Sequence, residues 1–395
     1  MGSIAVGTAA LAREDACTRR PTPEAPAWDR FAHWPRLRAR LGLLALSLIL
    51  LAATFGLAAP GATTEPPSII AAVSVDLPEK PERDADLALY DRAIERIQQG
   101  EPYYDFIVEE QRQRNYPVHP GLTVRLPTLA YINAFLGEAG QIAAALALLA
   151  AVMLAWWRRL REEPGGNDRL ALTLAFLYFG VSLGLNRNFF VLHELWAGML
   201  LALAFGLHRP GRKWGASLAV AALALAIREH ALPFVLLMSA MAFWRRDWRE
   251  ATAWSALAAA FLIALAVHLH IVEAQVLPND PPSYPWLVMR GLPGWLLNVT
   301  LSSNLRFLPS WIAGPVILLA VTGWAGWRSP AGTFGTFLFL GYGLAFMIAG
   351  RDANFYWGAV IAPAMFMGLV FMPRAVKSLL TSAFPSLAPA FAAAK

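Results

Sequence analysis

Cysteine is almost absent from this sequence, since Cys17 is the only one among 395 residues. A single thiol can form no intramolecular disulfide and supplies no cluster of thiolate metal ligands. The sequence also lacks a Gly-rich phosphate loop and a His/Cys cluster with metal-ligand spacing. His268 and His270, two positions apart, face different sides of a helix. These absences exclude a disulfide scaffold, and we predict no metal site.

Charge is scarce as well, at 15% of residues, against roughly 25% in a soluble domain. Hydrophobic residues make up 57% and gather in long runs. The first run, 41–60, is about 20 residues long, enough to cross ~30 Å of hydrocarbon. The pattern predicts an all-α polytopic membrane protein with about ten transmembrane helices. The further runs are 129–157, 170–185, 189–207, 215–227, 231–244, 251–271, 309–327, 332–349 and 355–373.

Basic residues set the predicted orientation. The net charge of +6 does not indicate nucleic-acid binding here, because Lys and Arg in a membrane protein mark the cytoplasmic loops. Seven arginines precede the first run, so we expect residues 1–40 to be a cytoplasmic tail before an uncleaved anchor. Residues 61–128 then form a long outer loop. The domain predicted for 41–373 also contains a second outer loop, 272–308, and residues 374–395 form a cytoplasmic tail.

Two pairs of runs are predicted to be hairpins. The runs 215–227 and 231–244 hold only 13 and 14 residues, and basic residues flank the pair on both sides. Both flanks should therefore be cytoplasmic, which places Arg228, Glu229 and His230 at an outer apex. The same reasoning makes 170–207 a hairpin with Arg187 at its apex.

Several charges fall at the outer ends of these predicted segments. Ionisable groups at membrane depth are costly unless they are paired or near water, so they are functional candidates. Their clustering at one side favours a site at the outer membrane face. An alternative is that Arg228 pairs with Glu194 only to hold two hairpins together. The residues concerned are Arg187, Glu194, Arg228, Glu229 and Arg351.

The first outer loop contains a predicted helix over 84–99, which Gly100 ends. Leu87, Tyr90, Ala93, Ile94 and Ile97 share one face at helical spacing, and Asp84, Asp91 and Glu95 lie opposite. Asp86 falls within the apolar face, where its carboxylate would point at whatever the helix packs on. Capping of the helix N-terminus is the alternative role for Asp86, although Asp84 is also able to cap.

At this helix the sequence resembles the GT-C superfamily of integral-membrane glycosyltransferases, which includes aminoarabinose transferases and protein O-mannosyltransferases. Residues 86–95, DLALYDRAIE, are similar to the loop pattern D-E-x-x-Y-A-E-x-A-R-x-M, with Leu87 where many members have a second acidic residue. RLPTLAY at 125–131 resembles the element K-P-P-L-x-Y. AIR at 226–228 and RDANFYW at 351–357, followed by Ala362-Pro363, resemble the later L-x-K and R…Y…P elements.

The resemblance implies transfer of a sugar from a polyprenyl-phosphate donor to a glycan, lipid or protein acceptor, by inverting displacement. It makes Asp86 the general base, and it implies that the donor phosphate is bound by Arg125, Arg228, Arg351 and Tyr356. Tyr90, Glu194, Glu229 and Arg187 would bind or support the substrate, and no cofactor is needed. The Ala-, Leu- and Arg-rich composition is typical of bacteria, so we expect an inner-membrane protein with a periplasmic site. A flippase for a lipid-linked saccharide and a non-catalytic assembly protein are the alternatives.

Overall fold

The structure is a computed structural model that describes residues 26–56 and 85–388. Its regular elements in these ranges are all helices, joined by irregular links, and these ranges contain no strand. The predicted tail residues 1–25, Cys17 and the loop residues 61–84, with Asp84, lie outside the described residues. The α-helices are α1 Arg36–Gly56, α3 Ala85–Gln98, α4 Tyr103–Gln113, α5 Thr128–Glu162, α6 Leu170–Val181, α7 His193–Leu207, α8 Gly215–Ile227, α9 Leu232–Trp244, α10 Trp248–Glu273, α11 Gly291–Leu301, α12 Ser310–Gly326, α13 Pro330–Ile348, α14 Ala362–Met365 and α15 Gly368–Ala383.

The described helices are those of a multi-pass membrane protein. Five helical stretches are long and apolar enough to cross a bilayer, and four more apolar helices are shorter. The long stretches are Arg36–Phe55, Gly121–Glu162, Asn167–Leu185, Trp248–Glu273 and Pro330–Ile348; the short ones are His193–Leu207, Gly215–Ile227, Glu229–Trp244 and Ser310–Gly326. The prediction of an all-α polytopic protein is therefore confirmed.

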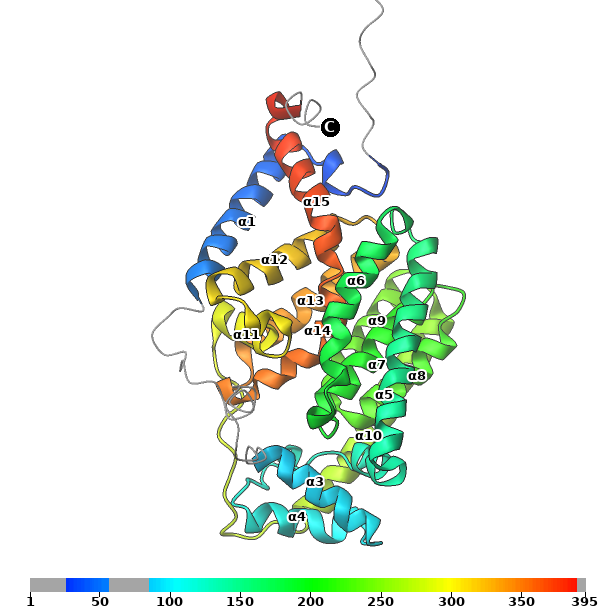
Figure 1. The fold of residues 1–395 in the computed structure, drawn as a ribbon, viewed down its shortest axis with the longest axis vertical. Helices are drawn as coiled ribbons and strands as arrows, with labels where there is room; N and C mark the ends of the chain where they lie inside the picture. The colour runs from blue at the N-terminus through cyan, green and yellow to red at the C-terminus, as the bar shows by residue number, and fades with distance from the viewer. Residues whose placement is uncertain (1–25, 57–84, 389–395) are drawn as a thin grey trace, which may run out of the picture.

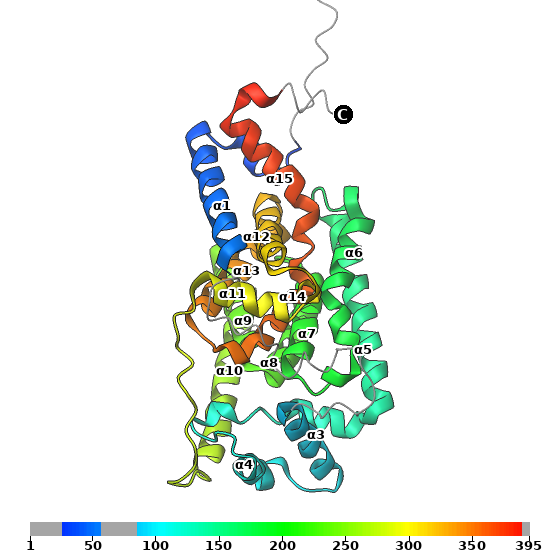
Figure 2. The same ribbon diagram turned by 60° about the vertical axis from the view of Figure 1, so that its left-hand side comes forward.

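The helices form an elongated bundle with two different ends (Figure 1). The amphipathic helices α3 and α4 lie across one end, beside the last turns of α10. The beginning of α1 and the end of α15 lie at the opposite end, and the turned view in Figure 2 keeps this arrangement. The segment 274–290, which we call the strap, leaves α10 at the α3–α4 end and runs along one side of the bundle to α11.

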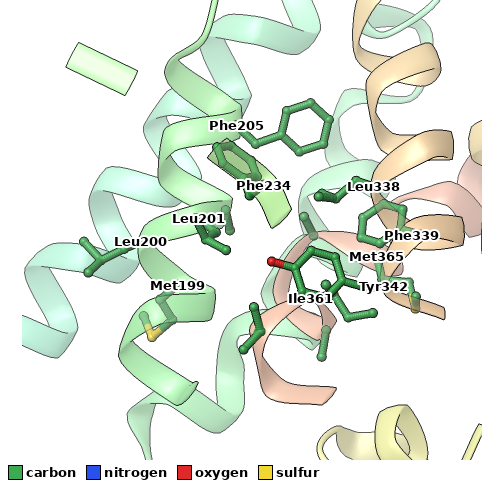
Figure 3. Packing of buried hydrophobic residues seen from close by; sticks show 14 of the residues in the cluster. Met199, Leu200, Leu201, Phe205, Phe234, Leu338, Phe339, Tyr342, Ile361 and Met365 are labelled. Atoms are coloured by element: carbon green, nitrogen blue, oxygen red, sulfur yellow. The ribbon is translucent and has the colours of Figure 1, made fainter. Parts of the chain in front are cut away.

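The core lies between α7, α9, α13 and the segment around α14 (Figure 3). Phe205, Phe234 and Phe339 are fully buried there. Figure 3 also shows the Tyr342 hydroxyl within this apolar cluster, and it donates a hydrogen bond of 2.5 Å to the carbonyl oxygen of His230. Because an unpaired hydroxyl would be costly in such a place, this bond fixes the turn between α8 and α9 against α13.

Three features differ from a simple reading of the apolar runs. The run 355–373 is not one helix, because the 3₁₀ segment η8 Asp352–Val360 precedes α14 and α15 begins only at Gly368. The predicted outer loop 272–308 contains α11, whose residues Trp295 and Leu296 are buried. Gly137 interrupts α5 with φ 63° and ψ −177°, a conformation open to glycine, and kinks that helix.

Candidate functional site

A cavity of about 260 Å³ lies between α3, α4, the segment 116–125 before α5, the strap and the beginning of η8. We call it the outer cavity. It brings together five of the nine residues that the sequence singled out, although they come from three separate parts of the chain. Those five are Asp86, Tyr90, Arg125, Arg351 and Tyr356.

Helix α3 presents Asp86 and Tyr90 to the outer cavity from neighbouring turns. Its predicted apolar face is confirmed, because Leu87 and Ala93 are buried and Tyr90 packs against the core. Asp86 lies within the first turn of α3, where a carboxylate also suits the positive helix end. At the far end of the helix Arg96 pairs with Glu110 of α4 over 3.1 Å, which joins the two helices.

Arg125 stands in the short extended link between η2 Gly121–Thr123 and α5. Its Nε donates to the hydroxyl of Tyr90 over 3.0 Å, and its Nη2 donates to that of Tyr356 over 3.2 Å. Its carbonyl oxygen accepts from the Tyr103 hydroxyl over 2.8 Å. Burial raises the pKa of Tyr90 although Arg125 opposes that shift, so Tyr90 stays a neutral hydroxyl at physiological pH. No carboxylate forms an ion pair with Arg125 within the described residues.

Arg351 enters the outer cavity from the turn that follows α13. Gly350 has φ +94°, which suits glycine, and its N–H donates to the carbonyl of Trp286 in the strap over 2.7 Å. The Asn354 side chain joins the turn to the site, because its Oδ1 accepts from the Arg351 N–H and its Nδ2 donates to Tyr356. Arg351 lies 5.9 Å from the ring of Tyr284, and in the described chain it too has no carboxylate partner within ion-pair distance.

Arg228, Glu194 and Glu229 lie close to this site but do not line the cavity. Arg228 Nε is 2.7 Å from Glu194, its Nη1 is 2.5 Å from Glu229, and the side chains of Arg228 and Glu194 are both only 1% exposed. The pair of Arg228 and Glu194, which the alternative of a purely structural role required, is thus present. Both carboxylates are also within electrostatic range of Arg125. The three residues form a charged layer behind the cavity wall.

Arg187 lies elsewhere. It pairs with Glu138 over 3.1 Å, and both side chains are largely exposed, at 70% and 75%. The two residues border a separate hollow on the side of α3 that carries Asp91 and Glu95. The structure therefore does not bring Arg187 together with the other candidates.

The strap closes the outer cavity on one side through Ser283 and Trp286. It is fixed to α4 by a bidentate ion pair, in which Arg112 Nε lies 2.6 Å and Nη2 lies 2.9 Å from the two carboxylate oxygens of Asp280. It is fixed to the Arg351 turn by Arg290, which pairs with Asp352 over 2.9 Å. These contacts hold the strap against both neighbours of the cavity.

Sequence reasoning missed several residues here. Asn354, Tyr103, Trp286 and Trp357 line the cavity. Of these, only Asn354 and Trp357 had a signal in the sequence, because both fall within the element 351–357. His193 was also missed. It packs edge to face on Tyr90 with 5.2 Å between ring centroids, and within the described residues neither ring nitrogen has a hydrogen-bond partner. A lone histidine in an apolar run gives no sequence signal for such a position.

No group of three or more His, Cys, Asp or Glu side chains is placed to hold a metal ion in the part of the chain that the structure describes. No curated protein and no solved structure matches the chain. A family model described as "Predicted membrane protein (DUF2079)" matches residues 84–374, a range that contains α3 and every residue of the outer cavity. Because that match covers well over half of the sequence, the chain belongs to the DUF2079 family of predicted membrane proteins.

Proposed function

We propose that the protein is a membrane glycosyltransferase with a GT-C-like arrangement of about ten membrane segments, acting on the periplasmic face of a bacterial inner membrane. The supporting observation is that Asp86 shares one cavity with Arg125 and Arg351, two arginines without a carboxylate partner in the described chain. The resemblance of residues 86–95 and 125–131 to glycosyltransferase motifs falls on two of these positions.

The charges on the cavity wall suit a phosphodiester. Among the described residues, two arginines and one aspartate are the charged residues that line it, which leaves one positive charge in excess. A polyprenyl-phosphate sugar carries one negative charge on its phosphate, so its binding would neutralise the excess positive charge of the cavity wall. Arginine suits this group because its planar fork donates paired hydrogen bonds and stays charged. Tyr356, with a hydroxyl that already accepts from Arg125, would complete the phosphate contacts.

The proposed reaction is a single inverting displacement. Asp86 takes the proton of the acceptor hydroxyl as its oxygen attacks the anomeric carbon, and the bond from that carbon to the phosphate oxygen breaks. The electron pair of that bond goes to the phosphate, where Arg125 and Arg351 stabilise the added negative charge. The electrostatic field around Arg125 is set by three charged residues behind the cavity wall, Arg228, Glu194 and Glu229.

The size of the outer cavity limits which part of the donor it holds. At about 260 Å³ it is slightly smaller than typical small-molecule sites of roughly 300–1,000 Å³. It would therefore take the sugar and phosphate, with the prenyl chain outside. Leu287 and Met289 of the strap, both 82% exposed, offer an apolar path next to Trp286.

The experiment is a transfer assay with the purified full-length protein, a polyprenyl-phosphate sugar and a membrane acceptor fraction. Asp86→Asn removes the proton acceptor at nearly constant size, so transfer should fall by ~10²-fold or more while the melting temperature is retained. Asp91→Asn is the matched control on the other face of α3 and should keep most of the activity. If the protein used a soluble nucleotide sugar in place of the lipid-linked one, the proposal would be rejected. If it moved a lipid-linked saccharide across a vesicle membrane without sugar transfer, a flippase would be favoured.

A further inference from the structure

A second cavity, of about 380 Å³, lies at the end of the bundle opposite α3 and α4. We call it the distal cavity. The far end of α5 contributes Arg159, the end of α9 contributes Arg245, and the loop before α13 contributes Arg328 and Ser329. Three guanidinium groups from separate parts of the chain therefore meet around one space, which the proposed transfer reaction does not use.

The acidic partners of these arginines do not balance them. Arg159 pairs with Glu163 over 3.1 Å, and Arg245 pairs with Glu250 over 3.0 Å. Arg328 has no ion-pair partner within the described residues. A fourth arginine, Arg30, reaches the cavity wall, where its Nη2 donates to Thr333 Oγ1 over 2.7 Å. Within the described residues, these four arginines therefore have two carboxylate partners, which leaves an excess of two positive charges.

Arg30 and Arg328 also act on each other directly. Burial, and after it the like charge of Arg328, lowers the pKa of Arg30. The Nε of Arg30 and the Nε of Arg245 are buried without a hydrogen-bond partner in the described structure. Adjacent cations with buried, unpartnered donors are stabilised by an anion placed between them.

The backbone adds to this attraction. Ser329 is the N-cap of α13, and its Oγ accepts from the Gly332 N–H over 2.8 Å. Pro330 has no N–H, and the Gly332 and Thr333 N–H groups both bond to Ser329. The Ala331 N–H and the dipole of this 19-residue helix therefore place further positive charge at this end of the helix.

We propose that the distal cavity is a binding site for a phosphate group, carried either by an anionic phospholipid headgroup or by a soluble phosphate. The arginine forks and the helix N-terminus together match the oxygens of a phosphate. Part of the wall is apolar, through Met241 and Phe334, and Trp244 and Trp248 are exposed near the end of α9, at 87% and 62%. Tryptophan is enriched where membranes meet water, which favours a position of the cavity near the depth of lipid phosphates.

The test measures binding to the full-length protein in a neutral detergent, without any transfer reaction. Its thermal unfolding midpoint is followed during separate titrations with inorganic phosphate and with a short-chain phosphatidylglycerol. Chloride at equal ionic strength and phosphatidylcholine of equal chain length are the reagent controls. A ligand that binds only the folded state raises the midpoint in a saturable way.

Arg328→Gln is the test variant, and it should weaken phosphate or lipid binding by about tenfold or more, because it removes one charge-assisted contact. Arg161→Gln is the matched control, since it removes a charge at the same end from an exposed arginine that lies over Trp157. The affinity of the Arg161→Gln variant for phosphate or lipid should equal that of the wild type. Arg328→Lys keeps the charge, which protects the fold, and should bind with intermediate strength.

Either ligand alone supports the proposal: a response to phosphatidylglycerol only identifies a headgroup site, and a response to inorganic phosphate identifies a soluble ligand. No saturable response to either ligand, or equal weakening in Arg328→Gln and Arg161→Gln, would overturn it. Because glycosyl transfer is not measured, this result is independent of the proposed reaction.

Discussion

Arg125 donates a hydrogen bond of 3.2 Å to the hydroxyl of Tyr356, which joins two residues that are 231 positions apart. Arg125 comes from the link into α5, and Tyr356 comes from the 3₁₀ segment after α13. Tyr90 of α3 binds the same guanidinium over 3.0 Å. The outer cavity therefore exists only when the segment from α3 to Arg125 and the last third of the chain pack against each other.

The buried pair of Arg228 and Glu194 should be essential for stability. Arg228→Gln leaves the buried Glu194 and the partly buried Glu229 without their nearest cation. Breaking the buried Arg228–Glu194 pair in this way costs about 3–5 kcal/mol. We expect a clear fall in the thermal unfolding midpoint in detergent. Arg187→Gln is the control, because its exposed pair with Glu138 contributes only about 0–1 kcal/mol. Equal midpoints for the two variants would contradict a structural role for Arg228.

The strap should loosen in acid. The hydrogen bonds from Arg112, and then that from the Leu277 N–H, lower the pKa of Asp280, and bonds from Gln113 and Arg112 lower that of Glu109. A depressed pKa gives stability that is complete above the unfolded value, about 3.9 for Asp, and is lost as the pH falls through the lower folded value.

Hydrogen exchange of the strap amides, corrected for the intrinsic rate, measures this effect. Protection should be constant from pH 7 to about pH 5 and fall at more acidic pH. Asp280→Asn should lower protection already at pH 7 and remove most of the acid dependence. Strong protection of the Asp280→Asn strap at neutral pH would show that its backbone contacts suffice.

The two ends of α10 should lie on opposite sides of the membrane. The helix has 26 residues and is therefore ~39 Å long, which exceeds the ~30 Å of hydrocarbon. Asp280 lies beside α4 through its contact with Arg112, and Trp248 begins the helix at its other end. Reporter fusions after Trp248 and after Asp280 should read cytoplasmic and periplasmic, respectively. The same side for both would exclude α10 as a membrane span.

The sequence was most informative where one residue pattern determines one structure. The apolar spacing of Leu87, Tyr90 and Ala93 predicted α3 and the face that it buries, and it marked Asp86 as a carboxylate on that face. Long apolar runs predicted α5 and α10, because only a helix satisfies its own backbone in a membrane.

The remaining features depend on contacts that a linear pattern does not contain. Hydropathy cannot separate a buried helix from a loop when the segment is short and bounded by arginines, as in α11 between Arg290 and Arg306. Nor can it tell that Arg228 turns to Glu194 behind the wall while Arg351 turns into the cavity. Both arginines follow the same rule about charge at membrane depth, and only the packing around them distinguishes the two.

Replacing Arg351 should weaken donor binding without lowering the stability of the fold. It lines the outer cavity, and within the described residues no carboxylate pairs with it, so its replacement breaks no ion pair there. Arg351→Lys keeps the charge but replaces a planar fork by a point charge, and the KM for the polyprenyl-phosphate sugar should rise by about tenfold. Arg351→Gln should raise it further. Both variants should keep the wild-type midpoint of thermal unfolding.

Arg290 provides the contrast that separates the two roles. It lies next to the Gly350 turn, but it bonds Asp352 over 2.9 Å and Asn298 over 2.9 Å, so its contacts are structural. Arg290→Lys should lower the unfolding midpoint and reduce the amount of active enzyme, with the KM for the donor little changed. The contradicting outcome is that Arg351→Lys lowers the midpoint as Arg290→Lys does and leaves the donor KM unaltered. Arg351 would then have a structural role beside the strap, and Arg125 alone would have to bind the donor phosphate.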